Sequence, residues 1–342
     1  MSNADRPAPA AVVFGCAGET LFAAESDFFR DVDPLGFILF ARNIDTPDQV
    51  RRLTADLRDA VGREDAIVMI DQEGGRVRRL RPPHWPDYPA MRPFGDKAVA
   101  DPDEAAACVA LNYGLIAEDL TELGIDVNCA PVLDLPTSDG HEIIGDRAFS
   151  DNPSIIARLG QAVCDGLSGG GVMPVIKHIP GHGRALADSH LELPRVDTPL
   201  DVLSTTDFVP FAALSGAPAG MTAHIVYEAI DPDEPGSSSQ AVVQDIIRGT
   251  IGFDGLLFSD DVCMKALSGP LDGRVNSVLA AGCDVALHCD GDFADMAKIA
   301  ATCPPMRPDS MERLQAARPN RSDSRSMDRE AAKRRISAFL DA

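Results

Sequence analysis

The chain has 342 residues, 45 % of them hydrophobic and 25 % charged, so it can bury a large core, and global disorder is not indicated. Its formal net charge of -22 argues against nucleic acid or an anionic membrane surface as the main partner. Eight cysteines are scattered through mostly apolar runs without a Cys-x-x-Cys pair, which favours buried thiols in a reducing compartment over a disulfide framework or a zinc site.

Apolar runs of strand length recur along the chain, and most have a helical pattern between them. Because these runs are continuously apolar, we expect strands of a parallel sheet that is covered by helices on its faces. The predicted strands, in chain order, are 11–16, 36–40, 66–71, 125–132, 172–178, 220–226, 255–260 and 284–288. A lipoprotein-type signal that ends at Cys16 is the alternative for the first run, which is too short to span a bilayer.

Helix signals separate these strands. Pro47 begins a helical apolar pattern that ends at Gly62, and Pro153 begins another that ends at the glycines 169–171. Further helices are predicted at 103–123, 239–251 and 273–281. Eight alternating units predict an α/β fold, a single (β/α)8 TIM-type barrel domain over residues 1–342, with an open doubly wound sheet as the alternative.

The tail from about residue 304 is rich in Arg, Asp and Ser and has a helical pattern only at 329–340. We expect a solvated linker and a terminal helix there, in preference to a regulatory arm.

Polar residues stand at nearly every predicted strand end, which is where barrel enzymes carry their chemistry. They are Asp71, Asp134, Lys177, His178, His224, Asp260, Asp261 and His288. The segment 177–190, KHIPGHGRALADSH, adds three histidines, a lysine and an aspartate in one glycine-broken stretch after an apolar strand. We interpret it as the active-site loop, because grouped titratable residues on a loop are typical of functional sites. A capped strand with a solvated loop is the alternative.

Three other stretches offer binding or reactive groups. DQEGGRVR at 71–78 combines Asp71 with Arg76, which suits hydrogen bonds to hydroxyls or to a carboxylate. IGDRAFS at 144–150 offers Arg147 in a loop. The pair Asp260 and Asp261 ends an apolar strand, so that one carboxylate could attack an electrophilic carbon, unless both cap the next helix.

These groups match the needs of glycoside transfer. A retaining glycosidase requires a carboxylate nucleophile and a second group that first donates and then accepts a proton. His190 can fill the second role if Asp188 orients it and stabilises the imidazolium.

The pieces DQEGGRV, GDRAFS, KHIPGHG with DSH, and FSDD, in this order along the chain, resemble the motifs of the β-N-acetylhexosaminidases of glycoside hydrolase family 3 that act in peptidoglycan recycling. The resemblance implies a retaining enzyme of the bacterial cytoplasm. It would hydrolyse terminal β-linked N-acetylglucosamine from 1,6-anhydro-N-acetylmuramyl (muropeptide) substrates.

Carried over by position, Asp260 corresponds to the nucleophile, and His190 with Asp188 to the acid/base dyad. The substrate-binding residues that the resemblance implies are Asp71, Arg76, Arg147, Lys177 and His178. Ile179 stands where Phe is common, and other residues usually occupy 262–263, but neither departure removes a functional group.

Three alternatives remain. The first is a β-N-acetylglucosaminide phosphorylase of the same family, because a neutral imidazole does not repel an anionic acceptor such as phosphate. A metal-dependent hydrolase with ligands His178, His182 and His190 is another, although their spacing is not a zinc pattern. A non-catalytic muropeptide sensor is the third. We expect a monomer that needs no metal or cofactor, binds a small amino-sugar substrate, and interacts with neither nucleic acid nor membrane.

Overall fold

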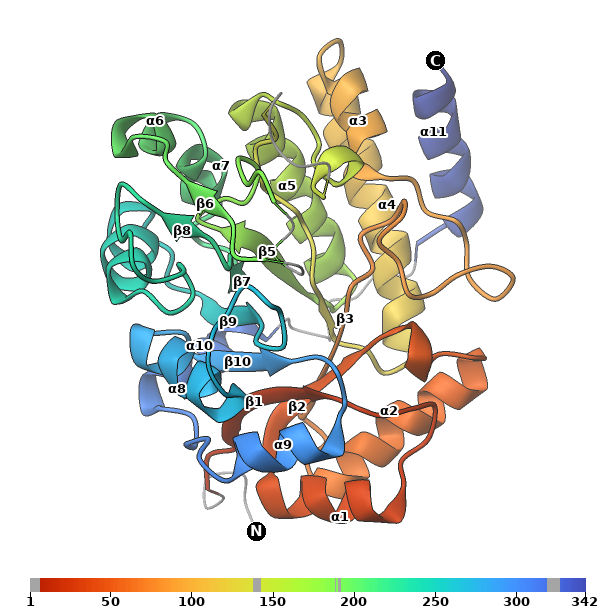
Figure 1. Cartoon of the computed structure of the whole chain (residues 1–342). Helices are drawn as coiled ribbons and strands as arrows, with labels where there is room; N and C mark the ends of the chain where they lie inside the picture. The colour runs from red at the N-terminus through yellow and green to blue at the C-terminus, as the bar shows by residue number, and fades with distance from the viewer. Residues whose placement is uncertain (1–6, 138–142, 188, 190–191, 319–326) are drawn as a thin grey trace.

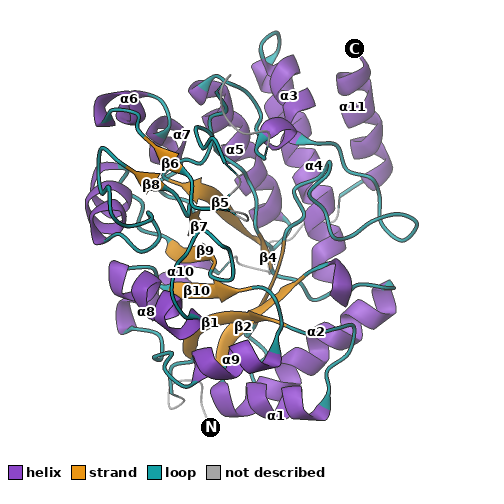
Figure 2. Cartoon of the chain, in the orientation of Figure 1, coloured by secondary structure: helices purple, strands orange, loops and turns teal. Residues whose placement is uncertain are grey.

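The computed structural model describes residues 7–137, 143–187, 189, 192–318 and 327–342. Eight parallel strands close into a barrel with helices around it (Figures 1 and 2). The barrel strands are β1 (Ala10–Gly15), β2 (Pro34–Leu39), β3 (Ile67–Ile70), β4 (Val127–Asn128), β5 (Met173–Ile179), β7 (Ala219–Thr222), β9 (Leu256–Asp261) and β10 (Val285–His288). Their order around the barrel is β1-β10-β9-β7-β5-β4-β3-β2. The α/β fold and the TIM-type barrel are therefore confirmed, and the open sheet is wrong.

Each predicted strand overlaps one barrel strand, but two of them, the runs 125–132 and 220–226, are shorter by three residues or more. The run 125–132 forms only β4, because Pro131 has no N–H to donate, although Ala130 and Pro131 still accept hydrogen bonds from β5. The run 220–226 ends as β7 at Thr222. Beyond it, β8 (Val226–Tyr227) pairs with β6 (Arg195–Val196) in a separate two-stranded sheet.

Each helix predicted from the sequence overlaps a helix of the structure, which also contains helices that were not predicted. The α-helices are α1 (Ala23–Val32), α2 (Pro47–Val61), α3 (Met91–Ala98), α4 (Pro102–Glu122), α5 (Pro153–Gly169), α6 (Leu200–Thr205), α7 (Phe208–Ala213), α8 (Leu271–Ala281), α9 (Phe293–Ala300), α10 (Pro308–Ala317) and α11 (Arg329–Asp341). Short 3₁₀ helices are η2 (Ala41–Asn43) and η3 (Gly145–Arg147), and η4 (Ala241–Thr250) is a π-helix. Pro47 stands at the start of α2, and Gly62 ends it with φ 61°, as predicted.

The strands are buried on both faces. All six residues of β2 and all seven of β5 are buried, including the polar pair Lys177 and His178. All eight cysteines, each within the described ranges, are free thiols, and six of them are buried. In the part of the chain that the structure describes, no helix has the length and apolar character needed to cross a membrane.

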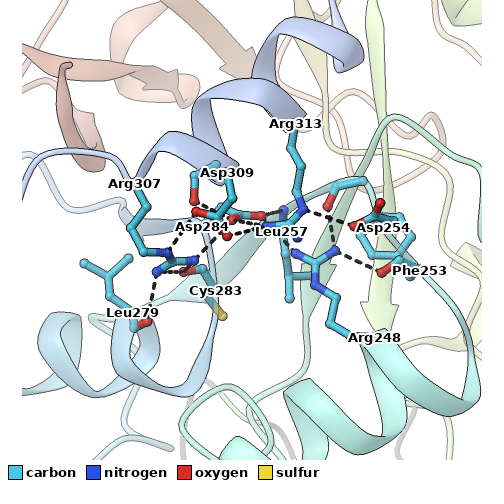
Figure 3. A network of polar contacts seen from close by, with 12 residues as sticks. Arg248, Phe253, Asp254, Leu257, Leu279, Cys283, Asp284, Arg307, Asp309 and Arg313 are labelled. Atoms are coloured by element: carbon cyan, nitrogen blue, oxygen red, sulfur yellow. Dashed lines mark hydrogen bonds and ion pairs between the residues drawn. The ribbon is translucent and has the colours of Figure 1, made fainter.

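The first part of the tail packs on the barrel, which corrects the expected solvated linker. Asp284, directly before β10, is the centre of a buried network at the N-terminal end of the barrel strands (Figure 3). Its carboxylate accepts hydrogen bonds from Leu257 N at 2.9 Å and Ser310 Oγ at 2.6 Å. Three arginines from two segments approach it as well: Arg248 at 2.9 Å, Arg313 at 3.1 Å and Arg307 at 3.3 Å. The network fastens α10 and η4 to the barrel.

The last helix, α11, agrees with the terminal helix expected at 329–340. It packs against α4, as Figure 1 shows. Arg329 pairs with Glu118 at 2.9 Å and Asp119 at 2.6 Å, and Arg335 forms two hydrogen bonds with Glu104.

Candidate active site

A cavity of about 390 Å³ opens where the barrel strands end. The predicted residues that line it are Asp71, Arg76, Arg147, Lys177, His178 and Asp260. Three larger cavities, of about 410, 470 and 570 Å³, lie elsewhere, the last two beside α10 and α11, and no predicted site residue lines any of them. The structure therefore brings six of the eight predicted site residues to one cavity.

The turn after β3 carries Asp71 to this cavity and places the buried carboxylate of Glu73 against the cavity-lining Arg147 and Lys177. Gly74 has φ 91°, and a Cβ atom there would lie 2.2 Å from Pro89 O, so the turn requires glycine. Gln72 is buried and its Oε1 accepts the backbone N–H of Arg79 at 2.9 Å. This bond folds the chain back, so that Arg79 reaches the carboxylate of Asp71, at 3.1 Å.

One side of the cavity is lined by Asp71, Arg79, Arg147 and Lys177. The buried Glu73 pairs with Arg147 and Lys177, and we call these five charged side chains the charged wall. Lys177 Nζ lies 2.8 Å from Asp71 Oδ1 and 2.7 Å from Glu73 Oε1. Arg147 donates from Nε and Nη2 to the two oxygens of Glu73, at 2.9 and 2.8 Å. The wall thus alternates cations and anions, and its geometry is fixed by paired charges.

The charges of the wall stabilise one another. Burial raises the pKa of the Glu73 carboxyl, but Arg147 and Lys177 outweigh burial and hold that pKa at about 2. In the same way Lys177 and Arg79 hold the pKa of Asp71 well below its usual range. Burial lowers the pKa of Lys177, but the two carboxylates outweigh burial and raise it above the usual value. The two carboxylates and Lys177 are therefore charged at neutral pH.

The next side of the cavity contains two histidines held by a buried aspartate. Asp134 Oδ1 accepts the backbone N–H groups of His178 at 3.2 Å and His182 at 2.7 Å. Asp134 Oδ2 lies 2.7 Å from His178 Nδ1. Because Nδ1 is occupied, Nε2 is the ring nitrogen with which His178 can reach a ligand.

His182 is a buried histidine with one ring partner. Its Nε2 lies 3.1 Å from Ser189 Oγ, and among the described residues its Nδ1 has no partner. Burial, together with the neighbouring His178, lowers the pKa of His182 from 6.5 to about 4. His182 is therefore neutral at physiological pH.

This histidine should make the fold sensitive to acid. Between pH 6.5 and 4 the unfolded chain binds a proton at residue 182 that the folded chain does not, so stability falls as the pH is lowered through this range. The loss from this one group is at most about 3 kcal/mol. Urea unfolding at a series of pH values should show a smaller pH dependence in His182→Gln than in the wild type. The exposed His84 provides the control, and an equal pH dependence in His182→Gln and His84→Gln would contradict the assignment.

Asp260 and Asp261, the last residues of β9, have different surroundings. Asp260 lines the cavity, and its Oδ1 accepts the backbone N–H of Asp261 at 2.8 Å. Asp261 Oδ1 accepts the backbone N–H groups of Cys263 at 3.0 Å and Cys289 at 3.2 Å. Burial raises the pKa of Asp261 to about 6. The next helix begins only at Leu271, so neither carboxylate caps it, and Asp261 instead holds the backbone after two neighbouring strands.

Arg76 lies at the rim of the cavity and is engaged in protein contacts. Its Nε donates to Asp146 Oδ1 at 2.8 Å, and its Nη2 donates to Ile143 O at 2.7 Å. It thus holds the segment that carries Arg147. Its expected role in substrate binding stays a prediction.

Two charged residues of the wall were not predicted. Glu73 could have been found, because residues two apart in an extended chain point to the same side and Asp71 was already a candidate. No comparable signal marked Arg79. Arg76, Arg78 and Arg79 lie close together in the sequence, which does not show which of them turns toward Asp71.

Asp188 and His190 lie outside the described residues, so their predicted roles stay predictions. Within the described ranges, one group of His, Cys, Asp or Glu side chains lies close enough to share an ion, namely Asp261, Cys263 and Asp290. It contains none of the histidines that the metal-hydrolase alternative requires.

Known proteins resemble this chain over most of its length. Residues 29–316 match the family described as the glycosyl hydrolase family 3 N terminal domain. A beta-hexosaminidase of Xanthomonas euvesicatoria pv. vesicatoria is 41 % identical over 285 residues, which cover 81 % of this chain and 83 % of that protein. A beta-hexosaminidase of Xylella fastidiosa is 39 % identical over 291 residues, 83 % of this chain and 84 % of the relative.

Solved structures agree. NagZ from Neisseria gonorrhoeae, in complex with N-trifluoroacetyl-D-glucosamine, superposes with a TM-score of 0.88 and 31 % identity over 98 % of this chain and 99 % of that chain. A family 3 beta-N-acetylglucosaminidase of Paenibacillus sp. gives a TM-score of 0.78 with 29 % identity, over 97 % of this chain and 62 % of that one. The chain therefore belongs to glycosyl hydrolase family 3 and is a glycoside hydrolase.

Proposed function

We propose that this enzyme is a retaining β-N-acetylhexosaminidase that removes terminal β-linked N-acetylglucosamine from 1,6-anhydro-N-acetylmuramyl substrates in peptidoglycan recycling. The observation that carries the proposal is one cavity with the carboxylate of Asp260 at a strand end and the charged wall beside it. The two sequence relatives named above are beta-hexosaminidases, the solved structure from Paenibacillus is a beta-N-acetylglucosaminidase, and the NagZ structure holds a glucosamine derivative. These names favour hydrolysis over phosphorolysis.

In the proposed mechanism Asp260 attacks the anomeric carbon while the protonated His190 gives its proton to the leaving oxygen. The bond to the leaving group breaks as the bond to Asp260 forms, which gives a covalent glycosyl-enzyme. His190, now neutral, then takes a proton from water as the water attacks the anomeric carbon and releases Asp260. Asp188 would orient the imidazole and stabilise its charged form.

Asp71, Arg147 and Lys177 are suited to hold the sugar, because ionised groups form strong and directional hydrogen bonds with hydroxyls. His178 would add its Nε2 atom. We also propose a cytoplasmic monomer that works without metal or cofactor. Free, mostly buried thiols are consistent with a reducing compartment.

The test is turnover of an aryl β-N-acetylglucosaminide compared with the matching aryl β-glucoside, with the anomeric configuration of the first product followed by NMR. We expect cleavage of the amino sugar in preference to the glucoside and a product that is initially β. An initially α product would contradict the retaining mechanism. Equal turnover of both sugars would contradict the sugar assignment.

Three further assays separate the remaining alternatives. N-acetylglucosamine 1-phosphate as the main product in phosphate buffer would identify a phosphorylase. Full activity after chelation is expected, and its loss would favour the metal-dependent hydrolase. A disaccharide with a 1,6-anhydro-N-acetylmuramyl leaving group should be cleaved at least as efficiently as chitobiose. Binding of this disaccharide without product release would identify a sensor.

A further inference from the structure

Glu73 occupies the middle of the charged wall, although no step of the mechanism uses it. Its side chain is 1 % exposed. Its backbone O accepts the hydroxyl of Tyr113 at 2.7 Å, and its backbone N donates to Val77 O at 2.9 Å. The carboxylate is therefore held in place from its own backbone, independently of any ligand.

This carboxylate occupies the donors with which Arg147 would otherwise bind an anion. A guanidinium binds carboxylate or phosphate most strongly through two parallel N–H groups. In Arg147 those two groups, Nε and Nη2, both donate to Glu73, and Nη1 lies 3.3 Å from Ile143 O. Lys177 likewise has one of its three donors directed to Glu73 and one to Asp71. What remains for a ligand is a set of single donors, which suits hydroxyl groups.

The charge balance of the wall leads to the same conclusion. Two carboxylates face three cations in the wall, and without Glu73 one carboxylate would face three cations. An uncompensated buried cation is costly, so the cavity would then attract an anion.

We propose that Glu73 is a positioning and specificity-determining residue of the sugar site. It holds Arg147 and Lys177 in the geometry that hydroxyls need, and it offsets part of their positive charge so that the cavity prefers a neutral sugar ring to an anionic ligand. The inference rests on the proposed function, because it takes the charged wall as the sugar-binding side of the cavity.

The experiment compares wild type and Glu73→Gln, a change that keeps the shape of the side chain and removes its charge. We expect kcat/KM for the aryl β-N-acetylglucosaminide to fall by about 10- to 100-fold, since hydrogen bonds to charged groups are lost. We also expect inhibition by sulfate, a small anion that can enter in any orientation, to strengthen by at least about tenfold, because the paired donors of Arg147 become available. A purely structural role would not change the sulfate inhibition.

Glu104→Gln is the matched control. Glu104 forms the same two-bond pair with Arg335, at 2.7 and 2.6 Å, on the outer surface between α4 and α11. It should keep both wild-type values. If Glu73→Gln does not fold, Glu73→Asp replaces it, because a shorter carboxylate must lose at least one bond to Arg147 or Lys177.

The outcomes are distinct. A folded Glu73→Gln enzyme with wild-type kcat/KM and wild-type sulfate inhibition would overturn the inference, as would unchanged kcat/KM in Glu73→Asp. A wild-type enzyme that does not cleave the substrate would instead overturn the proposed function.

Discussion

Replacing Asp260 by asparagine should lower kcat for an aryl β-N-acetylglucosaminide by about a million-fold, the scale seen when a catalytic nucleophile is removed. Asparagine has nearly the same shape and can still accept the Asp261 N–H that Asp260 accepts at 2.8 Å. The fold should therefore persist, with an unchanged thermal unfolding midpoint. Steady-state kinetics and thermal unfolding of the same preparation check both parts of the expectation.

Asp261→Asn is the control for this substitution. It changes the neighbouring carboxylate, whose Oδ1 accepts two backbone N–H groups, and an asparagine oxygen can replace that acceptor. We expect kcat to stay within about tenfold of wild type, since a neutral hydrogen bond contributes about 1 kcal/mol. If Asp261→Asn were the inactive variant and Asp260→Asn the active one, the nucleophile would have been assigned to the wrong carboxylate.

Replacing Asp284 by asparagine should lower the free energy of unfolding by about 3–5 kcal/mol, the typical cost of breaking a buried ion pair from one side. The Asp284 side chain is fully buried and meets Arg248, Arg307 and Arg313 (Figure 3). Without its charge, the buried part of this arginine cluster loses its main counterion. Chemical denaturation measures the loss directly.

Asp309→Asn provides the comparison. Its carboxylate contacts Arg307 and Arg313 at 3.4 and 3.1 Å, but its side chain is 53 % exposed. Exposed ion pairs contribute about 0–1 kcal/mol, so this variant should be nearly as stable as wild type. Equal losses in the two variants would mean that burial of Asp284 does not determine the stability of this network.

Much of the barrel could be predicted because its signals are local. A strand that is buried on both faces leaves a continuous apolar run, as β2 and β5 do, and helix ends leave proline and glycine, as at Pro47 and Gly62. Helix α10 was not predicted, although Pro308 stands in its first turn. Its contacts with the barrel come from arginines that pair with Asp284, more than 20 residues away in sequence, and no local pattern reveals that pairing.

Several residues of the candidate site could also be predicted from local signals, because they stand at the ends of apolar strands. Asp71, Lys177, His178 and Asp260 stand at strand ends, and closing the barrel brings such positions to one mouth. Which arginine turns inward was not visible in the sequence. That choice depends on the turn held by Gln72, which brings Arg79 to Asp71.

The spacing of the charged wall along the chain has a consequence for biosynthesis. Glu73 and Arg147 are 74 residues apart, and Asp71 and Lys177 are 106 residues apart. Contacts between such distant residues form only after the entropy of closing the intervening loop has been overcome. A nascent chain that has emerged from the ribosome only as far as β4 contains the carboxylates of Asp71 and Glu73. Their partners Arg147 and Lys177 have not yet emerged. The charged wall is complete only once β5, which carries Lys177, has been synthesised and has joined the sheet.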